Sequence, residues 1–299
     1  MQLLANPTLR LFIGAALISL SPVWVKFVSV SATSSAFWRL AIGGVVITSY
    51  LLLTRRRPQF TKRVWQILAL AAFFLALDLW FYHRSIQFIG PGLATLLANF
   101  QVFVMAAVGF VILRQPPSAR QLVAIPLALF GLALIVGVDW ETLPEDYRQG
   151  IVFGFGAAIT YAGYLLAMRS SRKDSTNRVP GREIAIVSLL GAAMLGFAAA
   201  AEGESLAIAS TSDLTWLICY GVLSHGFGML FITSSLPHVT TTQAGLALLL
   251  QPTLSFAWDV LFFARPMTAT ELLGAMIALF AIYLGSRAKS EQVQGASQN

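Results

Sequence analysis

The chain has 299 residues, of which 57% are hydrophobic and 11% are charged, and its mean hydropathy is +0.74. Soluble globular domains carry roughly 25% charged residues, so this composition excludes a protein whose whole surface faces water. The formal net charge of +7 alone would be compatible with nucleic-acid binding, but the placement of the basic residues described below argues against that class.

Continuously apolar runs follow one another along the chain, each close to the length of about 20 residues that a helix needs to cross a bilayer. These ten runs are 11–30, 34–53, 64–82, 91–113, 121–138, 150–168, 183–201, 214–235, 241–262 and 269–286. Because their hydrophobicity does not alternate, a membrane β-barrel is excluded. We therefore expect an all-α integral membrane protein with ten transmembrane helices, and the first run, which lacks a small-residue cleavage site, is expected to be retained.

The basic residues are distributed unevenly between the two sides of such a membrane protein. With the N-terminus in the cytoplasm, 15 of the 20 Lys and Arg residues fall in cytoplasmic segments, 3 fall in external segments, and Lys26 and Arg39 lie inside spans. The positive-inside rule then places both termini in the cytoplasm. Topology thus accounts for the charge, and we expect no nucleic-acid partner.

The two halves of the chain resemble each other. Moving the segment 91–138 forward by 150 residues places Gln101 on Gln251 and Pro116 on Pro266 without a gap. Since five spans are an odd number, a second copy starts from the opposite side of the membrane, as in the inverted repeats of many secondary transporters. We expect a first repeat at 1–138, a linker at 139–149, a second repeat at 150–288 and a disordered cytoplasmic tail at 289–299.

Ionisable residues inside spans are unusual, because each costs about 2.5–3.5 kcal/mol on insertion and therefore needs a partner or a function. The set comprises Lys26, Arg39, Asp78, His225 and Asp259, with His83 at the outer end of the third span. The direction of each span puts the two basic and two acidic residues in the outer leaflet. We expect them to form a charge layer, which is either a structural ion-paired layer or a gate that binds a charged group of the substrate. Lys26 and Asp259 alternatively extend to the interface.

His83 and His225 have different expected roles. Asp78 and Tyr82 share a helix face because they are four residues apart, whereas His83 turns away from Asp78, so no Asp–His relay exists within that helix. We expect His83 to lie at the membrane interface or to act through another span. His225 is a candidate proton carrier, because its unperturbed pKa of about 6.5 is close to physiological pH, or else a hydrogen-bonded packing residue.

Gln101 and Gln251 are each the eleventh residue of their runs, so both lie near the midplane, where inverted-repeat transporters form substrate sites. Alternatively, each forms interhelical hydrogen bonds worth about 1 kcal/mol. Asn99 and Phe103 lie close to Gln101 in the sequence. The other candidate substrate contacts are the polar or aromatic residues Asp78, Tyr82, Trp24, Tyr161, Tyr164, Trp258 and His225. The aromatic members would offer walls to an apolar or cationic substrate.

Four stretches together resemble the drug/metabolite transporter superfamily, in its EamA-type ten-helix branch. They are LDLWFYHRSIQFIGPGLATLLANFQVF (77–103), LRQPPSARQLVAIPLALFGLALIV (113–136), SSLPHVTTTQAGLALLLQPTLSF (234–256) and ARPMTATELLGAMIALFAIYLG (264–285). The resemblance implies a secondary active transporter of the bacterial inner membrane that works by alternating access and exports amino acids or other small metabolites. Its expected partners are a small-molecule substrate, the lipid bilayer and, as an option, protons, with no cofactor.

Other function classes receive less support. No G-x-x-x-x-G-K-[ST] loop is present, so the chain is not expected to hydrolyse ATP by itself. An intramembrane enzyme is disfavoured, because no G-x-S-x-G or H-E-x-x-H motif occurs and the adjacent Ser224 and His225 point apart on a helix. A non-transporting membrane scaffold or lipid-binding protein stays open as the alternative.

Overall fold

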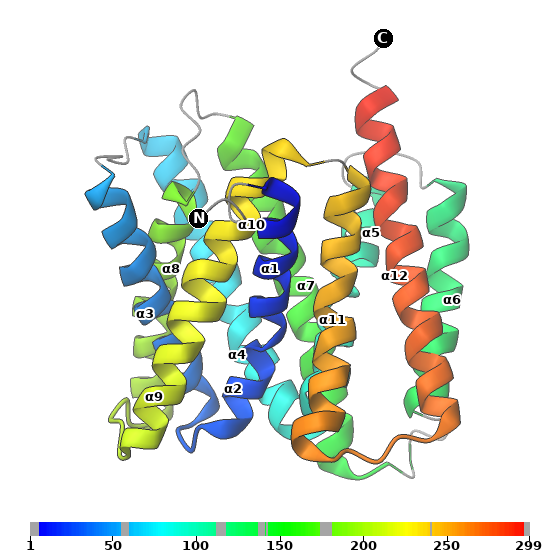
Figure 1. Ribbon diagram of the computed structural model, residues 1–299, viewed down its shortest axis with the longest axis horizontal. Coiled ribbons are helices and arrows are strands. Elements are labelled where there is room, and N and C mark those ends of the chain that lie inside the picture. The colour runs from blue at the N-terminus through cyan, green and yellow to red at the C-terminus, as the bar shows by residue number, and fades with distance from the viewer. Residues whose placement is uncertain are drawn as a thin grey trace.

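The computed structural model describes residues 6–54, 60–111, 118–136, 141, 143–173, 181–239 and 241–295, and within these ranges it contains helices and no strands. The helices are α1 (Pro7–Ser19), α2 (Ser21–Phe27), α3 (Ala32–Leu53), α4 (Lys62–Ala98), α5 (Gln101–Val111), α6 (Ala119–Val136), α7 (Glu145–Lys173), α8 (Arg182–Glu202), α9 (Thr211–Cys219), the π-helix η3 (Tyr220–Gly228), α10 (Met229–Ser235), the 3₁₀-helix η4 (Leu236–His238), α11 (Thr241–Phe263) and α12 (Ala269–Gly295). They form a single bundle (Figure 1).

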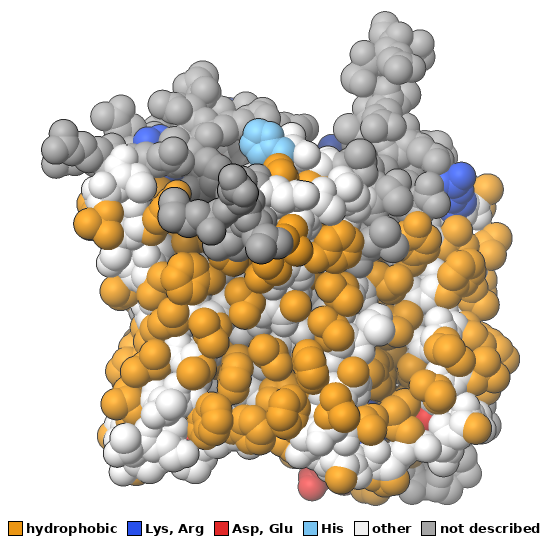
Figure 2. All heavy atoms as spheres, in the orientation of Figure 1, with side chains coloured by type: hydrophobic (Ala, Val, Ile, Leu, Met, Phe, Trp, Pro, Cys, Tyr) orange, Lys and Arg blue, Asp and Glu red, His pale blue; other side chains and the backbone are white. Residues whose placement is uncertain are grey.

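The described helices match the expected spans. Seven helical stretches are long and apolar enough to cross a membrane, and one of them, Lys62–Val111, has 50 residues, more than twice the length that one crossing requires. Two shorter apolar helices, Leu249–Phe263 and Ala269–Leu284, follow. Hydrophobic side chains cover most of the middle of the face shown in Figure 2, with basic residues near its upper edge and acidic residues near its lower edge. The prediction of a helical membrane protein is confirmed.

The 150-residue shift that aligns the two halves of the sequence also aligns their helices. α3 begins at Ala32 and α8 at Arg182, while α6 begins at Ala119 and α12 at Ala269. Within each of these two pairs the helices also pack against each other extensively. In the second pair, Gly131 and Gly274 allow backbone contact, because a Cβ atom on Gly131 would lie 2.7 Å from the carbonyl oxygen of Gly274.

Several predicted spans contain breaks. α1 ends and α2 begins around Leu20, just before Pro22, where proline lacks the N–H that a continuing helix needs. α4 contains Gly90 with φ 82° and ψ 166° before Pro91, a conformation that glycine adopts without steric cost. The helix up to this kink is longer than predicted, so the third span does not end at residue 82.

A further break separates α4 from α5 at residues 99 and 100, one residue before Gln101. In the second half α11 continues through the equivalent positions despite Pro252. The two halves therefore share their helix order but differ locally at the midplane.

The ends of the predicted repeats also differ in detail. α12 extends to Gly295, so the helix continues into the segment 289–299 that was predicted to be disordered. α7 begins at Glu145, within the predicted linker. The basic residues at 55–57, Arg114 and Arg178, which contribute to the predicted orientation, lie outside the described residues, so the placement of the termini stays a prediction.

Candidate functional site

Two chambers lie inside the bundle and share part of their lining. The central chamber has a volume of about 110 Å³, and the second chamber has a volume of about 340 Å³. Both are lined by Ile18, Arg39, Asp78, Tyr161 and Gln251, so they adjoin each other and together make up the cavity of the bundle.

The second chamber extends toward one end of the bundle. Its lining includes Arg169, near the end of α7, and Leu236 in η4. These elements finish at the end of the bundle where α1 begins and α12 finishes, the upper end in Figure 1. The cavity therefore runs from the middle of the bundle toward that end.

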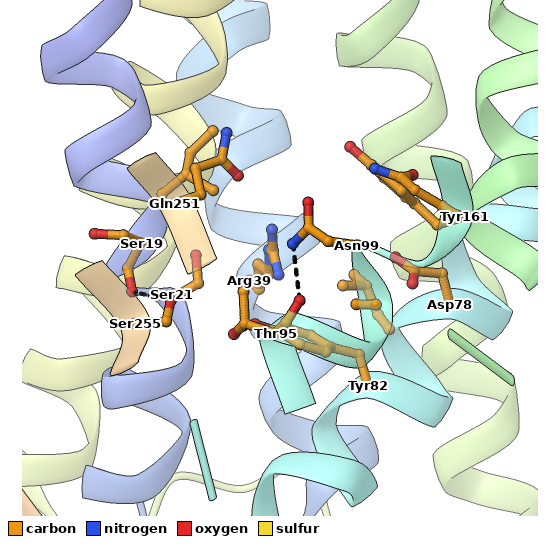
Figure 3. A pocket seen from close by; sticks show the side chains of 14 residues that line it. Ser19, Ser21, Arg39, Asp78, Tyr82, Thr95, Asn99, Tyr161, Gln251 and Ser255 are labelled. Atoms are coloured by element: carbon orange, nitrogen blue, oxygen red, sulfur yellow. Dashed lines mark hydrogen bonds between the residues drawn. The ribbon is translucent and has the colours of Figure 1, made fainter. Parts of the chain in front are cut away.

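Most of the polar residues predicted for substrate binding meet at this cavity. The central chamber is lined by Gln101, Gln251, Asp78, Tyr82, Asn99 and Tyr161. Tyr164 and His225 line the second chamber. Figure 3 shows Asp78 and Tyr161 on one side of the view and Gln251 on the other. Gln101 and Gln251, 150 residues apart in the chain, thus contribute to one chamber.

Unpaired polar groups surround the central chamber. The Oε1 atom of Gln101, the Nε atom of Arg39 and the Oγ atom of Ser21 are buried and have no hydrogen-bond partner among the described residues. Buried polar groups without a partner cost free energy. Because these atoms have almost no exposed surface, a polar ligand in the chamber would supply the missing partners only after their side chains move.

Arg39 and Asp78 bring opposite charges to the same chamber. Within the described part of the chain, Asp78 forms no hydrogen bond and no ion pair with a nitrogen within 4.0 Å, although it is 6% exposed. Arg39 instead donates from Nη1 to the hydroxyl of Tyr220 at 3.0 Å. The two charges therefore face a common space without neutralising each other directly.

His83 is buried, and this corrects the expectation that it lies at the interface. It is 0% exposed, and its Nδ1 lies 2.7 Å from the carbonyl oxygen of Leu79. Its Nε2 lies 2.9 Å from the hydroxyl of Tyr220. His83 therefore bonds to another helix, and its partner Tyr220 was not singled out in the sequence.

The π-helix η3 explains why Tyr220 and His225 both face inward. Hydrogen bonds in a π-helix join residues five apart, so these two residues lie one turn apart on the same side. His225 Nε2 lies 2.7 Å from Ser188 Oγ, and its Nδ1 is buried without a partner in the described structure. A Cβ atom on Gly43 would lie 2.5 Å from the His225 ring, so glycine at this position gives the ring its space.

Small hydroxyl residues complete the central chamber, and the sequence analysis missed them. They are Ser19, Ser21, Thr95 and Ser255. Thr95 donates to the carbonyl oxygen of Pro91 at 2.7 Å, so the hydroxyl of Tyr82, at 2.8 Å, donates to Thr95. Serine and threonine are common at helix interfaces in membranes, so their composition alone gives no signal of a site.

Three predicted aromatic residues lie outside the cavity lining. Trp24 stacks on Trp216 with 5.5 Å between ring centroids. Phe103 packs on Phe100, with their ring centroids 5.4 Å apart. Trp258 donates from Nε1 to the Oγ atom of Ser19 at 2.9 Å and thereby supports a lining residue.

The expected charge layer does not form as an ion-paired layer among the described residues. Lys26 donates from Nζ to the carbonyl oxygen of Gln87 at 3.0 Å. Asp259 pairs with Arg265, at 3.4 Å, and accepts from the backbone N–H of Gly92 at 3.0 Å. These contacts bind α2 and α11 to the region around the kink in α4.

Two acidic residues, Glu202 and Asp213, form hydrogen bonds between helices and loops at the end of the bundle opposite the second chamber. Glu202, at the end of α8, accepts hydrogen bonds from Thr33, Trp80 and Arg84. Asp213 in α9 accepts from both the backbone N–H and the hydroxyl of Ser29, at 2.7 and 2.6 Å. These bonds link α3, α4 and α8, and they hold α9 to the segment before α3.

Comparisons with known proteins agree with this architecture. The model of the EamA-like transporter family matches residues 8–137 and 148–287. The chain is 25% identical over 260 residues to the uncharacterized inner membrane transporter YhbE of Escherichia coli K12, covering 82% of this chain and 78% of that protein. It is 23% identical over 169 residues to an uncharacterized transporter of Haemophilus influenzae, covering 55% and 54% of the two chains.

A solved structure described only as "Crystal structure of protein" shares the fold. It superposes with a TM-score of 0.66 at 15% identity, and the match covers 93% of this chain and 97% of that one. The comparison supports the helical arrangement, and the site residues rest on the geometry above.

Proposed function

This chain belongs to the EamA-like transporter family, and we propose that it exports small zwitterionic metabolites such as amino acids from the bacterial cytoplasm by alternating access. The family match makes it a membrane transporter. A relative in Escherichia coli is described as an inner membrane transporter. The substrate class, the direction of transport and the mechanism are the proposal.

The observation that carries the substrate class is the unpaired placement of Arg39 and Asp78 on one chamber. A zwitterion presents a carboxylate to the guanidinium and an ammonium group to the carboxylate, and hydrogen bonds between charged groups are the stronger ones. A molecule with a single charge would leave one of the two protein charges buried without a partner, which is costly. The unpaired amide oxygen of Gln101 supplies an additional acceptor for an ammonium group.

The arrangement of the cavity supports binding of a substrate from the cytoplasm, which is the first step of export. Hydrogen bonds of Glu202 link helices at one end, whereas the second chamber extends toward the other. If the positive-inside prediction holds, the second end faces the cytoplasm, so this conformation is ready to accept a cytoplasmic substrate. Alternating access then requires the repeats to rock about the site. In a proton-coupled cycle, His225 on the second chamber is the proposed carrier.

The test is transport by the purified protein in proteoliposomes loaded with radiolabelled amino acids. We expect efflux of at least one of them, loss of efflux in Asp78→Asn, and normal efflux in Asp146→Asn, whose side chain is exposed on α7. An imposed pH gradient tests coupling in the same vesicles. If none of the twenty amino acids is transported or stabilises the protein against heat, the zwitterion proposal is wrong.

A further inference from the structure

Three residues from three helices form a hydrogen-bonded chain beside the central chamber. Arg39 on α3 donates to the hydroxyl of Tyr220 on η3, and that hydroxyl bonds to Nε2 of His83 on α4. Arg39 and His83 belong to the first half of the chain and Tyr220 to the second. This series of hydrogen bonds therefore links the two halves of the protein at the side of the cavity.

The direction of each hydrogen bond in this chain is fixed by chemistry. The carbonyl oxygen of Leu79 only accepts, so Nδ1 of His83, at 2.7 Å, carries the hydrogen. In the neutral ring Nε2 is then an acceptor, and the Tyr220 hydroxyl donates to it at 2.9 Å. The oxygen of Tyr220 therefore keeps its lone pairs for Arg39. His83 thus sets the orientation of the Tyr220 hydroxyl, which in turn holds the guanidinium.

Tyr220 binds Arg39 without neutralising it. The hydroxyl is uncharged, and the guanidinium carbon also lies 5.2 Å from the centre of the Tyr220 ring. A carboxylate at this position would form an ion pair and cancel the charge. With a neutral acceptor, Arg39 keeps its positive charge while its long side chain is held in place at the chamber wall.

The terminal nitrogens of Arg39 keep donors that Tyr220 does not use. Arginine has five N–H donors; one is used by Tyr220, and the Nε atom is buried with no partner in the described structure. Arg39 lines both chambers. Its planar fork suits the two oxygens of a carboxylate.

We propose that Tyr220 and His83 are positioning residues, which hold Arg39 as the group that recognises the carboxylate of the transported metabolite. This inference rests on the proposed transport of zwitterions, and it assigns a role to two residues that bind no substrate themselves. It predicts that their loss changes selectivity for the carboxylate rather than binding in general.

The experiment measures binding of three amino acids and their decarboxylated amines to the purified full-length protein by calorimetry. The pairs are leucine and 3-methylbutylamine, phenylalanine and 2-phenylethylamine, and lysine and 1,5-diaminopentane. We expect the native protein to prefer the amino acid in at least one pair. Tyr220→Phe, which keeps the ring over Arg39, should lower that preference about tenfold, because hydrogen bonds to charged groups are the stronger class.

Two variants of His83 supply an independent test. His83→Leu removes the acceptor for the Tyr220 hydroxyl and should lower the preference about threefold, the effect of one neutral hydrogen bond. His83→Gln offers an amide oxygen in its place and should restore most of the preference. Tyr50→Phe is the matched control, because it makes the same chemical change on α3 at a residue that is 43% exposed and should leave the preference unchanged.

Each outcome separates the two proposals. If the native protein binds none of the six compounds, this inference is overturned, whereas the zwitterion proposal is decided by the transport assay with all twenty amino acids. If it binds an amino acid but Tyr220→Phe weakens the amino acid and the amine equally, Tyr220 has a structural role and only this inference is overturned. A normal preference in His83→Leu would likewise overturn the role of His83.

Discussion

The carboxylate of Asp259 on α11 accepts a hydrogen bond from the backbone N–H of Gly92 in α4, with 3.0 Å between Oδ2 and the nitrogen. Gly92 lies in the first turn after the kink at Gly90, where backbone N–H groups lack partners within the helix. Glycine at the kink has no side chain to cap them. The second half of the chain therefore supplies the cap for a helix of the first half, and the negative charge also suits the helix dipole.

We expect Gly90→Ala to destabilise the protein. Gly90 has φ 82° and ψ 166°, where a residue with a Cβ atom costs about 1–3 kcal/mol, and the added Cβ would lie 3.0 Å from Oδ2 of Asp259. Thermal unfolding in detergent should show a lower Tm. Gly109→Ala is the matched control, because no atom lies within 4 Å of its added Cβ, and its Tm should be unchanged or higher. Equal Tm values for the two variants would contradict this account of the kink.

Gly43→Ala tests the packing of the π-helix. An added Cβ would lie 2.5 Å from Cδ2 of His225 and 2.9 Å from the carbonyl oxygen of Gly221, so η3 must move. Overpacking of this kind typically costs about 1–3 kcal/mol. We expect a lower Tm and weaker substrate binding, because Tyr220 lies on the same π-helix. Native-like binding in a stable Gly43→Ala protein would show that the position of η3 does not affect the site.

Asp78→Asn should weaken binding of amino acids and of their amines alike. The change removes the negative charge that faces the chamber while keeping the size of the side chain, and hydrogen bonds to charged groups contribute about 1.5–3 kcal/mol. A loss of about tenfold or more is expected by calorimetry. This pattern differs from that of Tyr220→Phe, which should affect the amino acid selectively. Unchanged amine binding would show that Asp78 does not bind the ammonium group. Asp146→Asn serves as the control for the charge change.

Glu202→Gln should weaken the contacts between helices at the end of the bundle opposite the second chamber. The carboxylate of Glu202 lies 3.0 Å from Arg84 and accepts from Thr33 and Trp80, and an amide cannot replace the ion pair. The native cysteine is removed by Cys219→Ser, and a reporter cysteine is introduced by Asn99→Cys. An impermeant maleimide added outside intact cells should then label the reporter cysteine faster in Glu202→Gln than in the protein that keeps Glu202. This assumes the predicted orientation of the termini.

Glu145→Gln is the matched control for this experiment. The Glu145 carboxylate bonds to Arg148 and Gln149 within the same helix α7, so its neutralisation should not open the bundle. Equal labelling rates in Glu202→Gln and in the native background would show that the hydrogen bonds of Glu202 do not hold this end closed.

The sequence alone was sufficient for the class of fold and for the choice of Gln101 and Gln251 as neighbours of one chamber. Continuous hydrophobicity dictates membrane helices, because backbone groups in lipid must be satisfied within the helix. Depth follows from counting residues, since each adds about 1.5 Å along the axis. Gln101 and Gln251, chosen by depth, both line one chamber. The helix starts at Ala32 and Arg182 also obey the 150-residue shift.

The tertiary structure decided which way each side chain faces and what it meets. The kink at Gly90 and the π-helix η3 change the direction of later residues, and hydropathy does not reveal either feature. As a result His83 meets Tyr220 in the interior, Asp259 caps a helix of the other half, and Trp24 and Trp258 lie outside the cavity. Depth is a property of one helix and can be read from its sequence, whereas a partner depends on how neighbouring helices pack and where they break.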